Sequence, residues 1–357
     1  MSRTAEIAGN NIKYHVMDPT GNITILVETP VEEASQPFIA AELMQLEPDA
    51  EQVGFLTIPA VKSAGTQPAG TQPAGITGQT AADTPERHTD DQRFCDIALR
   101  MAGGEFCGNA TMSAAAFYAA RNNIREGTVT VRVSGAAEPV PVEIHLDTAE
   151  PVPAEICLTA EASALSENGP VYHGTVTMPC PVAITEVKLP DYDPEETDCV
   201  YPVVHFEGID HVILEEKTDL NRARAEELAP LWCRALQAEA VGLMFLNRSE
   251  GTLTPLVYVP EAGTLVWENS CASGTSAVGA WAASRMPAES AGSDAAGETA
   301  AVQPKNIAGG TAAAPEENPG GGNPAVQLSL QEPGGILRVE VSADGAIRLT
   351  GTVRERQ

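Results

Sequence analysis

Apolar and polar residues alternate in short runs along most of the chain. A period near two is typical of strands that bury one face. The pattern predicts strands at residues 23–27, 129–133, 142–146, 200–206, 241–246, 253–259 and 265–267, and a final meander at residues 326–330, 336–341 and 347–349. The turns of the meander are expected at Pro333-Gly334-Gly335 and Asp344-Gly345. We therefore expect more strand than helix.

Four longer stretches predict helices, at residues 37–46, 108–122, 220–237 and 274–285. The second and fourth are rich in alanine, and each closely follows a cysteine. The third is expected to begin at Thr218 or Asp219, since a short oxygen-bearing side chain before a periodic run is typical of an N-cap.

Two segments interrupt this pattern. Residues 61–93 contain a tandem AGTQP repeat, and residues 287–323 are rich in Ala, Gly, Glu and Pro. Such compositions bury too little apolar surface to offset the chain entropy that folding removes. We predict two disordered surface insertions.

A chain of 357 residues is long enough for two domains. The helices that follow Cys107 and Cys271 lie about one domain length apart, which predicts two α/β lobes with a site between them. We expect the first lobe at residues 1–148 and the second at residues 149–344, with a last strand at about 345–357 returning to the first lobe.

The net charge of the chain excludes some classes of binding partner. Forty-nine acidic and 21 basic side chains give a formal net charge of −28, which repels nucleic acids and anionic membranes. The N-terminus has no apolar core typical of a signal peptide, and no apolar run approaches the ~20 residues that span a bilayer. We expect a cytoplasmic protein with neither nucleic-acid nor membrane partners.

The seven cysteines show neither C-x-x-C pairs nor zinc-ligand spacing with histidine. We therefore expect no disulfide framework and no metal site. Most of the cysteines are expected to be small buried hydrophobic residues, namely Cys95, Cys157, Cys180, Cys199 and Cys233.

Cys107 and Cys271 differ from the others, because each sits among small residues just before an expected helix. Backbone N–H groups and the helix dipole at such a position lower a thiol pKa. Two thiols of this kind suit a reaction in which one removes the α-proton of an amino acid and the other returns a proton on the opposite face. The same N–H groups can hold the α-carboxylate. No lysine lies in a recognisable pyridoxal-phosphate setting, which favours a route without cofactor.

Three segments carry a family resemblance: residues 103–111 (GGEFCGNAT), 269–275 (NSCASGT) and 18–27 (DPTGNITILV). They resemble the diaminopimelate epimerase superfamily, and within it the histidine racemases that supply D-histidine to opine-type, staphylopine-like metallophore synthesis. The resemblance implies an α/β (α+β) fold of two similar lobes, each a curved or barrel-like, mostly antiparallel sheet around a central helix. It also implies that Cys107 and Cys271 are the two catalytic bases and that no cofactor is used.

The resemblance also implies substrate-binding positions. Asn22 matches an early Gly-Asn of the superfamily, and Gln52 matches its Asp-Gln-Val segment. His211 falls near its Gly-Asn-Pro-His, where it would support a thiol; an ordinary strand histidine is the alternative. The candidate substrate-binding residues are Asn22, Gln52, Gly108, Asn109, His211, Glu268, Ala272, Ser273 and Gly274.

The chain differs from diaminopimelate epimerases at one segment that bears on the choice of substrate. Diaminopimelate epimerases carry Glu-Arg-Gly before the second cysteine, whereas this chain has Glu-Ala-Gly at residues 261–263. A distal carboxylate would lose its bidentate partner, which argues against diaminopimelate. Glu51, Glu261 or Glu268 is instead a candidate to accept a hydrogen bond from an imidazole. The alternatives are a diaminopimelate or other amino-acid epimerase, and a redox-sensing protein that binds amino acids without turnover. A homodimer is possible.

Overall fold

A computed structural model describes residues 2–58, 95–147, 170–190, 198–215, 221–261, 263–286 and 326–357. The insertions expected at residues 61–93 and 287–323 lie outside these ranges, as do Thr218, Asp219 and Cys157. Within the described ranges, no helix combines the length and apolar character needed to cross a membrane.

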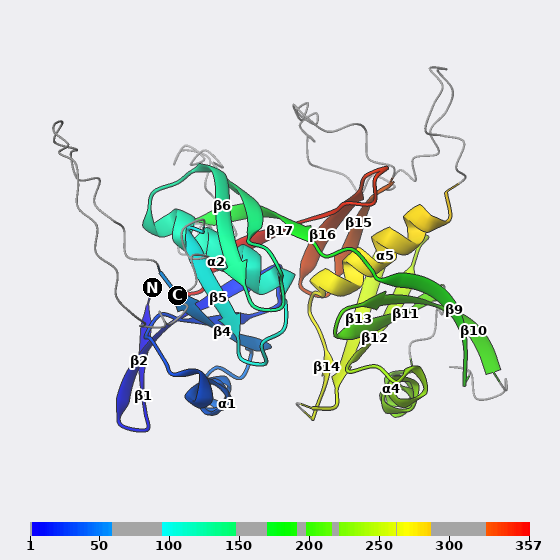
Figure 1. Cartoon of the computed structure of the whole chain (residues 1–357), viewed down its shortest axis with the longest axis horizontal. Coiled ribbons are helices and arrows are strands. Elements are labelled where there is room, and N and C mark those ends of the chain that lie inside the picture. Colours follow the sequence, from blue (N-terminus) through cyan, green and yellow to red (C-terminus); the bar gives the residue numbers. More distant parts are fainter. Residues whose placement is uncertain are drawn as a thin grey trace, which may run out of the picture.

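The N-terminal half forms a closed ring of eight strands around one helix (Figure 1). Each strand of the ring pairs with two others of the ring, and most pairs are antiparallel. The central helix is α2 (Gly108–Arg121). The strands are β2 (Asn10–Pro19), β3 (Thr24–Val27), β4 (Gln52–Thr57), β5 (Ile97–Met101), β6 (Glu126–Val133), β7 (Val140–Leu146), β8 (Val171–Met178) and β17 (Ile347–Glu355).

Helix α2 is buried on nearly every side, which explains its composition. A helix enclosed by strands has no polar face, and alanine lets the surrounding backbone come close. Ala110, Ala114, Ala115 and Ala119 are all inaccessible to solvent. Outside the ring, β1 (Arg3–Ile7) and α1 (Gln36–Leu46) pack on the N-terminal strands, and the short η1 (Glu33–Ser35) directly precedes α1.

The second half is a curved sheet around a second small-residue helix, α5 (Ala272–Ser284). A more amphipathic helix, α4 (Arg222–Leu236), covers its other face and buries Trp232 and Leu228 there. Both α1 and α4 lie on the same side of the molecule (Figure 1). The strands are β9 (Ala183–Pro190), β10 (Asp198–Phe206), β11 (Ile209–Glu215), β12 (Val241–Asn247), β13 (Thr252–Val259), β14 (Thr264–Trp267), β15 (Val326–Glu332) and β16 (Gly335–Val341).

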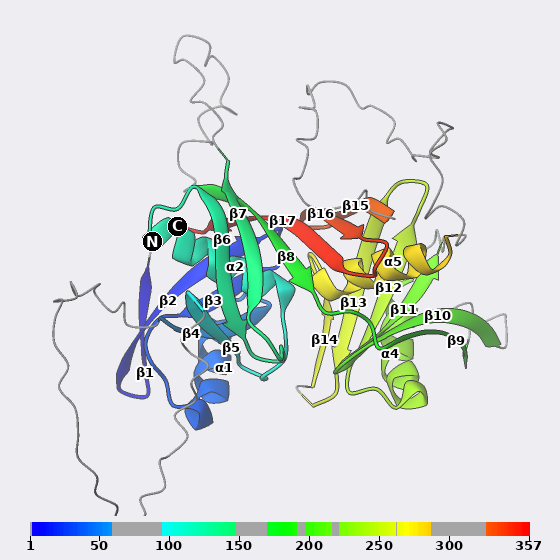
Figure 2. The same ribbon diagram turned by 45° about the horizontal axis from the view of Figure 1, so that its top comes forward.

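Strand β17 joins the two sheets. Residues 347–350 pair with β16 and residues 353–355 pair with β2, while β8 follows the other edge of β17 (Figure 2). Side chains of β16 and β17 enter the same hydrophobic core as α2, and Ala272 and Ala280 of α5 reach it too. The expected fold class, two similar lobes each with a curved sheet around a helix, is confirmed. The boundary near residue 148 stays a prediction; β8, which follows it in sequence, pairs within the first ring.

The local expectations differ from the structure in three respects. Helix α4 begins after Asn221, whose side-chain oxygen accepts the Arg224 N–H at 3.1 Å, and not at Thr218 or Asp219. Helix α5 begins at Ala272, two residues earlier than expected. Seven strands were not predicted from the sequence pattern: β1, β2, β4, β5, β8, β9 and β11.

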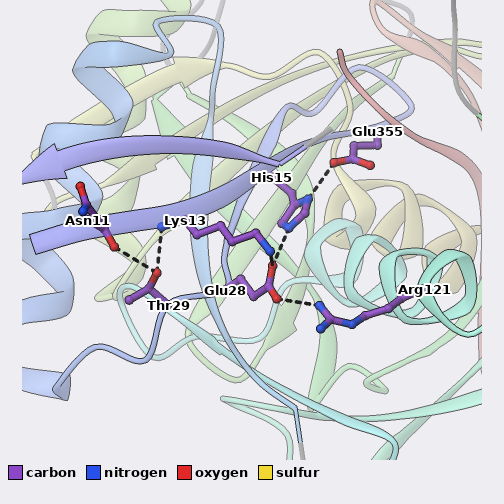
Figure 3. Close-up of polar contacts among 7 residues, drawn as sticks. All are labelled: Asn11, Lys13, His15, Glu28, Thr29, Arg121 and Glu355. Atoms are coloured by element: carbon purple, nitrogen blue, oxygen red, sulfur yellow. Dashed lines mark hydrogen bonds and ion pairs between the residues drawn. The ribbon is translucent and has the colours of Figure 1, made fainter.

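A polar network anchors the end of α2 that lies opposite Cys107 (Figure 3). His15 on β2 bridges Glu355 on β17, at 2.7 Å, and Glu28, at 3.0 Å. Glu28 also pairs with Lys13 at 2.8 Å and with Arg121, the last residue of α2, at 2.6 Å. Burial alone would raise the pKa of Glu28, but hydrogen bonds from His15, Lys13 and Arg121 lower it to about 2. The network therefore ties the helix to two strands of the ring.

The halves also meet through two glycines. A methyl group added at Gly334, in the turn between β15 and β16, would lie 2.4 Å from the Thr20 carbonyl oxygen and 2.6 Å from the Gly21 Cα. Backbone atoms cannot move aside as a flexible side chain can. Gly334 N–H also donates to the Asn269 carbonyl at 2.7 Å, so this turn is held against both halves.

We predict that Gly334→Ala destabilises the protein strongly, because the added methyl group would force the two halves apart. Overpacking of this kind costs about 1–3 kcal/mol or more. Thermal unfolding followed by circular dichroism measures the effect. Gly9→Ala is the comparison, because an added Cβ there meets nothing within 4 Å and only its positive φ opposes the change; Gly334→Ala should lower the melting temperature more. Equal melting temperatures for Gly334→Ala and wild type would contradict the prediction.

Candidate active site

Cys107 and Cys271 occupy the same position in their two helices. Each is the N-cap, with extended backbone at φ −134°, ψ 115° and φ −124°, ψ 102°. Each sulfur accepts the backbone N–H three residues later, from Ala110 and Gly274, at 3.4 Å in both cases. The expectation that both cysteines stand at helix N-termini is confirmed.

The two helix starts touch. A methyl group on Gly108 would lie 3.0 Å from the Cβ of Ala272, and these residues directly follow the two cysteines. In Figure 1, α2 and α5 point toward each other across the middle of the molecule. The space is closely filled: a methyl group on Gly274 would lie 2.2 Å from the Met244 Sδ and 3.1 Å from the Cys271 Sγ. The fold therefore brings the two cysteine turns into one site.

Amide side chains link Cys107 to the opposite turn. The Cys107 thiol donates to the Gln52 Oε1 at 2.9 Å, and the Gln52 amide donates to Asn22. The Asn22 Nδ2 then donates to the Ser270 carbonyl at 3.1 Å, next to Cys271. The Asn109 Nδ2 donates to the same carbonyl at 3.2 Å. Asn109 is 2% exposed, and its Oδ1 has no hydrogen-bond partner in the described part of the chain.

Three glutamates gather around Cys271. Glu268 interacts with its thiol, and the Glu332 Oε2 accepts its backbone N–H at 2.7 Å. Glu51 accepts from the Asn22 Nδ2 at 2.6 Å and from the Asn269 Nδ2 at 2.7 Å. The sequence analysis named Glu51 and Glu268 but missed Glu332, because a glutamate before Pro-Gly-Gly is typical of an exposed hairpin turn. Glu261 lies exposed in the turn between β13 and β14.

His211 lies on β11 beside Gly242 of β12, and not on either cysteine turn. It is fully buried on β11, in a T-shaped arrangement with Phe206 at 5.9 Å between ring centroids, and its Nδ1 lies close to Gly242. Neither ring nitrogen has a hydrogen-bond partner in the described part of the chain. Burial lowers the pKa of His211 to about 3, so the ring is neutral. The remaining candidate, Ser273, places its hydroxyl 3.6 Å from the Cys271 sulfur.

The family described as the histidine racemase CntK N-terminal domain matches residues 86–156 and 157–293, more than half of the chain. This protein belongs to that family. A histidine racemase from Fusobacterium nucleatum is 26% identical over 269 residues, covering 74% of this chain and 78% of its own. A histidine racemase from Staphylococcus aureus is 26% identical over 270 residues, covering 75% of this chain and 78% of its own. A phenazine biosynthesis protein of the PhzF family from Bacillus anthracis shares the fold at 12% identity, with a TM-score of 0.53 and 97% coverage of both chains.

The thiols of this racemase-family protein are less acidic than their helix positions imply. Burial raises the pKa of Cys107 to about 12, with smaller contributions from Glu105 and Glu268. Burial also raises the pKa of Cys271, and Glu268 and Glu332 raise it further. At Cys107 the Ala110 N–H lowers the pKa as expected, but desolvation is the larger effect. The expectation of lowered thiol pKa values is therefore wrong for this structure.

The pKa values of the three glutamates are raised as well. Burial raises the pKa of Glu51 to about 7 and those of Glu268 and Glu332 to about 8, against hydrogen bonds that act the other way. Mutual repulsion adds to the shift of Glu268 and Glu332. The cluster therefore holds protons near neutral pH, and an added positive charge would favour its ionised form.

We predict that the free energy of unfolding falls as pH rises from about 5 to 8. These carboxyls lose their protons near pH 4.5 in the unfolded chain, but only near pH 7–8 in the folded one. The folded state therefore binds more protons across this window, and raising the pH favours unfolding. Urea unfolding at pH 5.5 and 8.5 measures the fall.

Glu268→Gln is the test variant, and its fall in stability should be smaller than that of wild type. Glu250→Gln, an exposed site in the turn between β12 and β13, should keep the wild-type fall. The prediction is wrong if Glu268→Gln and wild type show the same pH dependence. The low pKa of Glu28 does not interfere, because its contribution is lost only below about pH 4.5.

Proposed function

We propose that this protein is an amino-acid racemase that interconverts L- and D-histidine without a cofactor, with Cys107 and Cys271 as its two bases. The observation that carries the proposal is the repeated thiol geometry at two helix starts that touch. The family match and the curated histidine racemases support the reaction and the substrate.

The proposed reaction needs one thiolate and one thiol. The thiolate removes the α-proton as the Cα–H bond breaks, and the electron pair stays on the α-carbon, delocalised into the carboxylate. The other thiol then gives its proton to the opposite face of that carbon. The two cysteines end with their protonation states exchanged, and each serves as base for one enantiomer.

The helix starts supply a place for the α-carboxylate. First-turn N–H groups have no acceptor within their own helix, and those of Gly108, Asn109, Ala272 and Ser273 belong to this class. The Gly274 N–H is not available, because it donates to the Cys271 sulfur. These amides would also stabilise negative charge as it builds on the carboxylate during proton removal. The unpaired Asn109 oxygen is an acceptor suited to the α-ammonium group.

The acidic cluster supports histidine as the substrate. Glu51 and Glu268 are hydrogen-bond acceptors beside the cysteine turns, and an imidazole N–H is a matching donor. Glu268 is a better candidate than Glu261, which lies exposed on a turn. A substrate with a distal carboxylate would instead be repelled by the cluster, which disfavours diaminopimelate.

Three further parts of the proposal stay predictions. They are a cytoplasmic location, which the N-terminal sequence favours, a homodimer, and use of the D-histidine product in opine-type metallophore synthesis, which the family resemblance implies. Size-exclusion chromatography with light scattering tests the dimer directly.

We predict that wild-type enzyme in deuterated water incorporates deuterium at the α-carbon of L-histidine and forms D-histidine. Cys107→Ser and Cys271→Ser should each lower the racemisation rate by at least ~100-fold, since each removes one of the two acid/base groups. Proton NMR and chiral chromatography measure exchange and product. Cys180→Ser is the control, because Cys180 is exposed and lies outside this site. Binding of histidine without α-proton exchange would reject racemase activity and favour the redox-sensing alternative.

We predict that histidine is the best substrate among a panel that includes diaminopimelate, proline, leucine and lysine. Glu268→Gln should lower kcat/KM for histidine by about tenfold or more, the usual effect of losing a charged hydrogen bond. Glu250→Gln should keep the wild-type value. Faster turnover of diaminopimelate than of histidine would overturn the substrate assignment while leaving the two-thiol chemistry intact.

A further inference from the structure

The two cysteine turns have matching backbones but differ in the contact that a threonine makes. A threonine stands four residues after each cysteine. The Thr111 hydroxyl donates to the Cys107 carbonyl at 2.7 Å, within its own helix. The equivalent Thr275 hydroxyl donates to the Glu332 Oε1 instead. The other oxygen of Glu332 accepts the Cys271 backbone N–H at 2.7 Å.

Glu332 takes the place of a missing helix cap. In a capping box, a glutamate at the third helical position accepts the N–H of the N-cap residue. That position in α5 is Gly274, where any side chain would collide with Met244 and with the Cys271 sulfur. The carboxylate therefore comes from the end of β15, 61 residues away in sequence. It is 1% exposed, so its charge is poorly screened by solvent.

We propose that Glu332 is a positioning residue that makes the two cysteines unequal. It holds the Cys271 turn in place and keeps the proton on Cys271, so that Cys107 ionises first and is the base of the resting enzyme. The role of Cys107 as a base rests on the proposed function, whereas the difference in ionisation between the two thiols does not.

The surroundings of each thiol support this order. Cys271 is 4% exposed and faces carboxyls from two elements, Glu268 before α5 and Glu332 on β15. Glu51 repels both of these carboxylates. Cys107 is only half-buried, and the charges that act on it are those of Glu105 and Glu268. The thiols titrate above pH 8, where Glu332 has lost its own proton. A full negative charge then opposes thiolate formation at Cys271.

Alkylation by iodoacetamide tests the proposal without any substrate, because the thiolate is the species that reacts. The rate at each cysteine is followed by peptide mass spectrometry from pH 7 to 10.5, in wild type, Glu332→Gln and the exposed control Glu250→Gln. In wild type, Cys107 should react at lower pH than Cys271. Glu332→Gln should raise the Cys271 rate about tenfold between pH 8.5 and 10.5, where Glu332 is ionised in the wild type, because a thiol pKa lowered by one unit gives ten times more thiolate at a fixed pH below that pKa. Cys107 should change less than about twofold.

A second variant separates charge from packing. Thr275→Val removes the hydroxyl donor but keeps the Glu332 carboxylate, so the Cys271 rate should not rise. A general loosening of the turn would instead raise the Cys271 rate in both variants. The proposal is overturned if Glu332→Gln leaves the Cys271 rate unchanged, or if Thr275→Val raises it equally. Loss of racemase activity has no bearing on either result, so failure of this proposal and of the proposed function remain distinguishable.

Discussion

The contact between the first turns of α2 and α5 is the constraint on which the rest of the site depends. Two helices can meet end to end only where small residues leave room, and Gly108 faces Ala272 at this point. The meeting brings two N-cap cysteines together and aims two sets of first-turn amides at the same region. The Ser270 carbonyl, held by Asn22 and Asn109, fastens the turns across the interface. The glycine pair Gly21 and Gly334 permits the same close approach nearby.

Electrostatics distinguishes the site from the supporting structure. Glu28 lies among His15, Lys13 and Arg121, and its pKa falls to about 2. Glu332 is more deeply buried, receives neutral donors, and has a pKa of about 8. The same residue type is thus held ionised where it anchors α2 and held toward its neutral form where it caps α5. In the described part of the chain no cation pairs with Glu51, Glu268 or Glu332, and such a cluster suits a ligand that brings its own positive charge, as an amino acid does.

The sequence pattern predicted the elements whose local signals are strong. Alanine-rich stretches after Cys107 and Cys271 indicated the two central helices, and the C-terminal meander was found where alternation and Pro-Gly or Asp-Gly turns coincide. Strands such as β2 and β8 were missed, because ring closure imposes strand pairing on segments whose own alternation is weak. The cap of α4 was misplaced because several oxygen-bearing residues precede that helix, and only the backbone path selects Asn221.

The sequence by itself was enough to predict the class of the fold, the two cysteines of the site, and the amide and glycine residues that surround them. These features can be recognised in short, contiguous motifs. The tertiary structure alone decided how those motifs interact. It brought Glu332 to Cys271 from 61 residues away, and it reversed the expected shift of the thiol pKa values. The physical reason is that capping and helix dipoles act over one turn of chain, whereas burial and charge repulsion depend on every element that packs around a group.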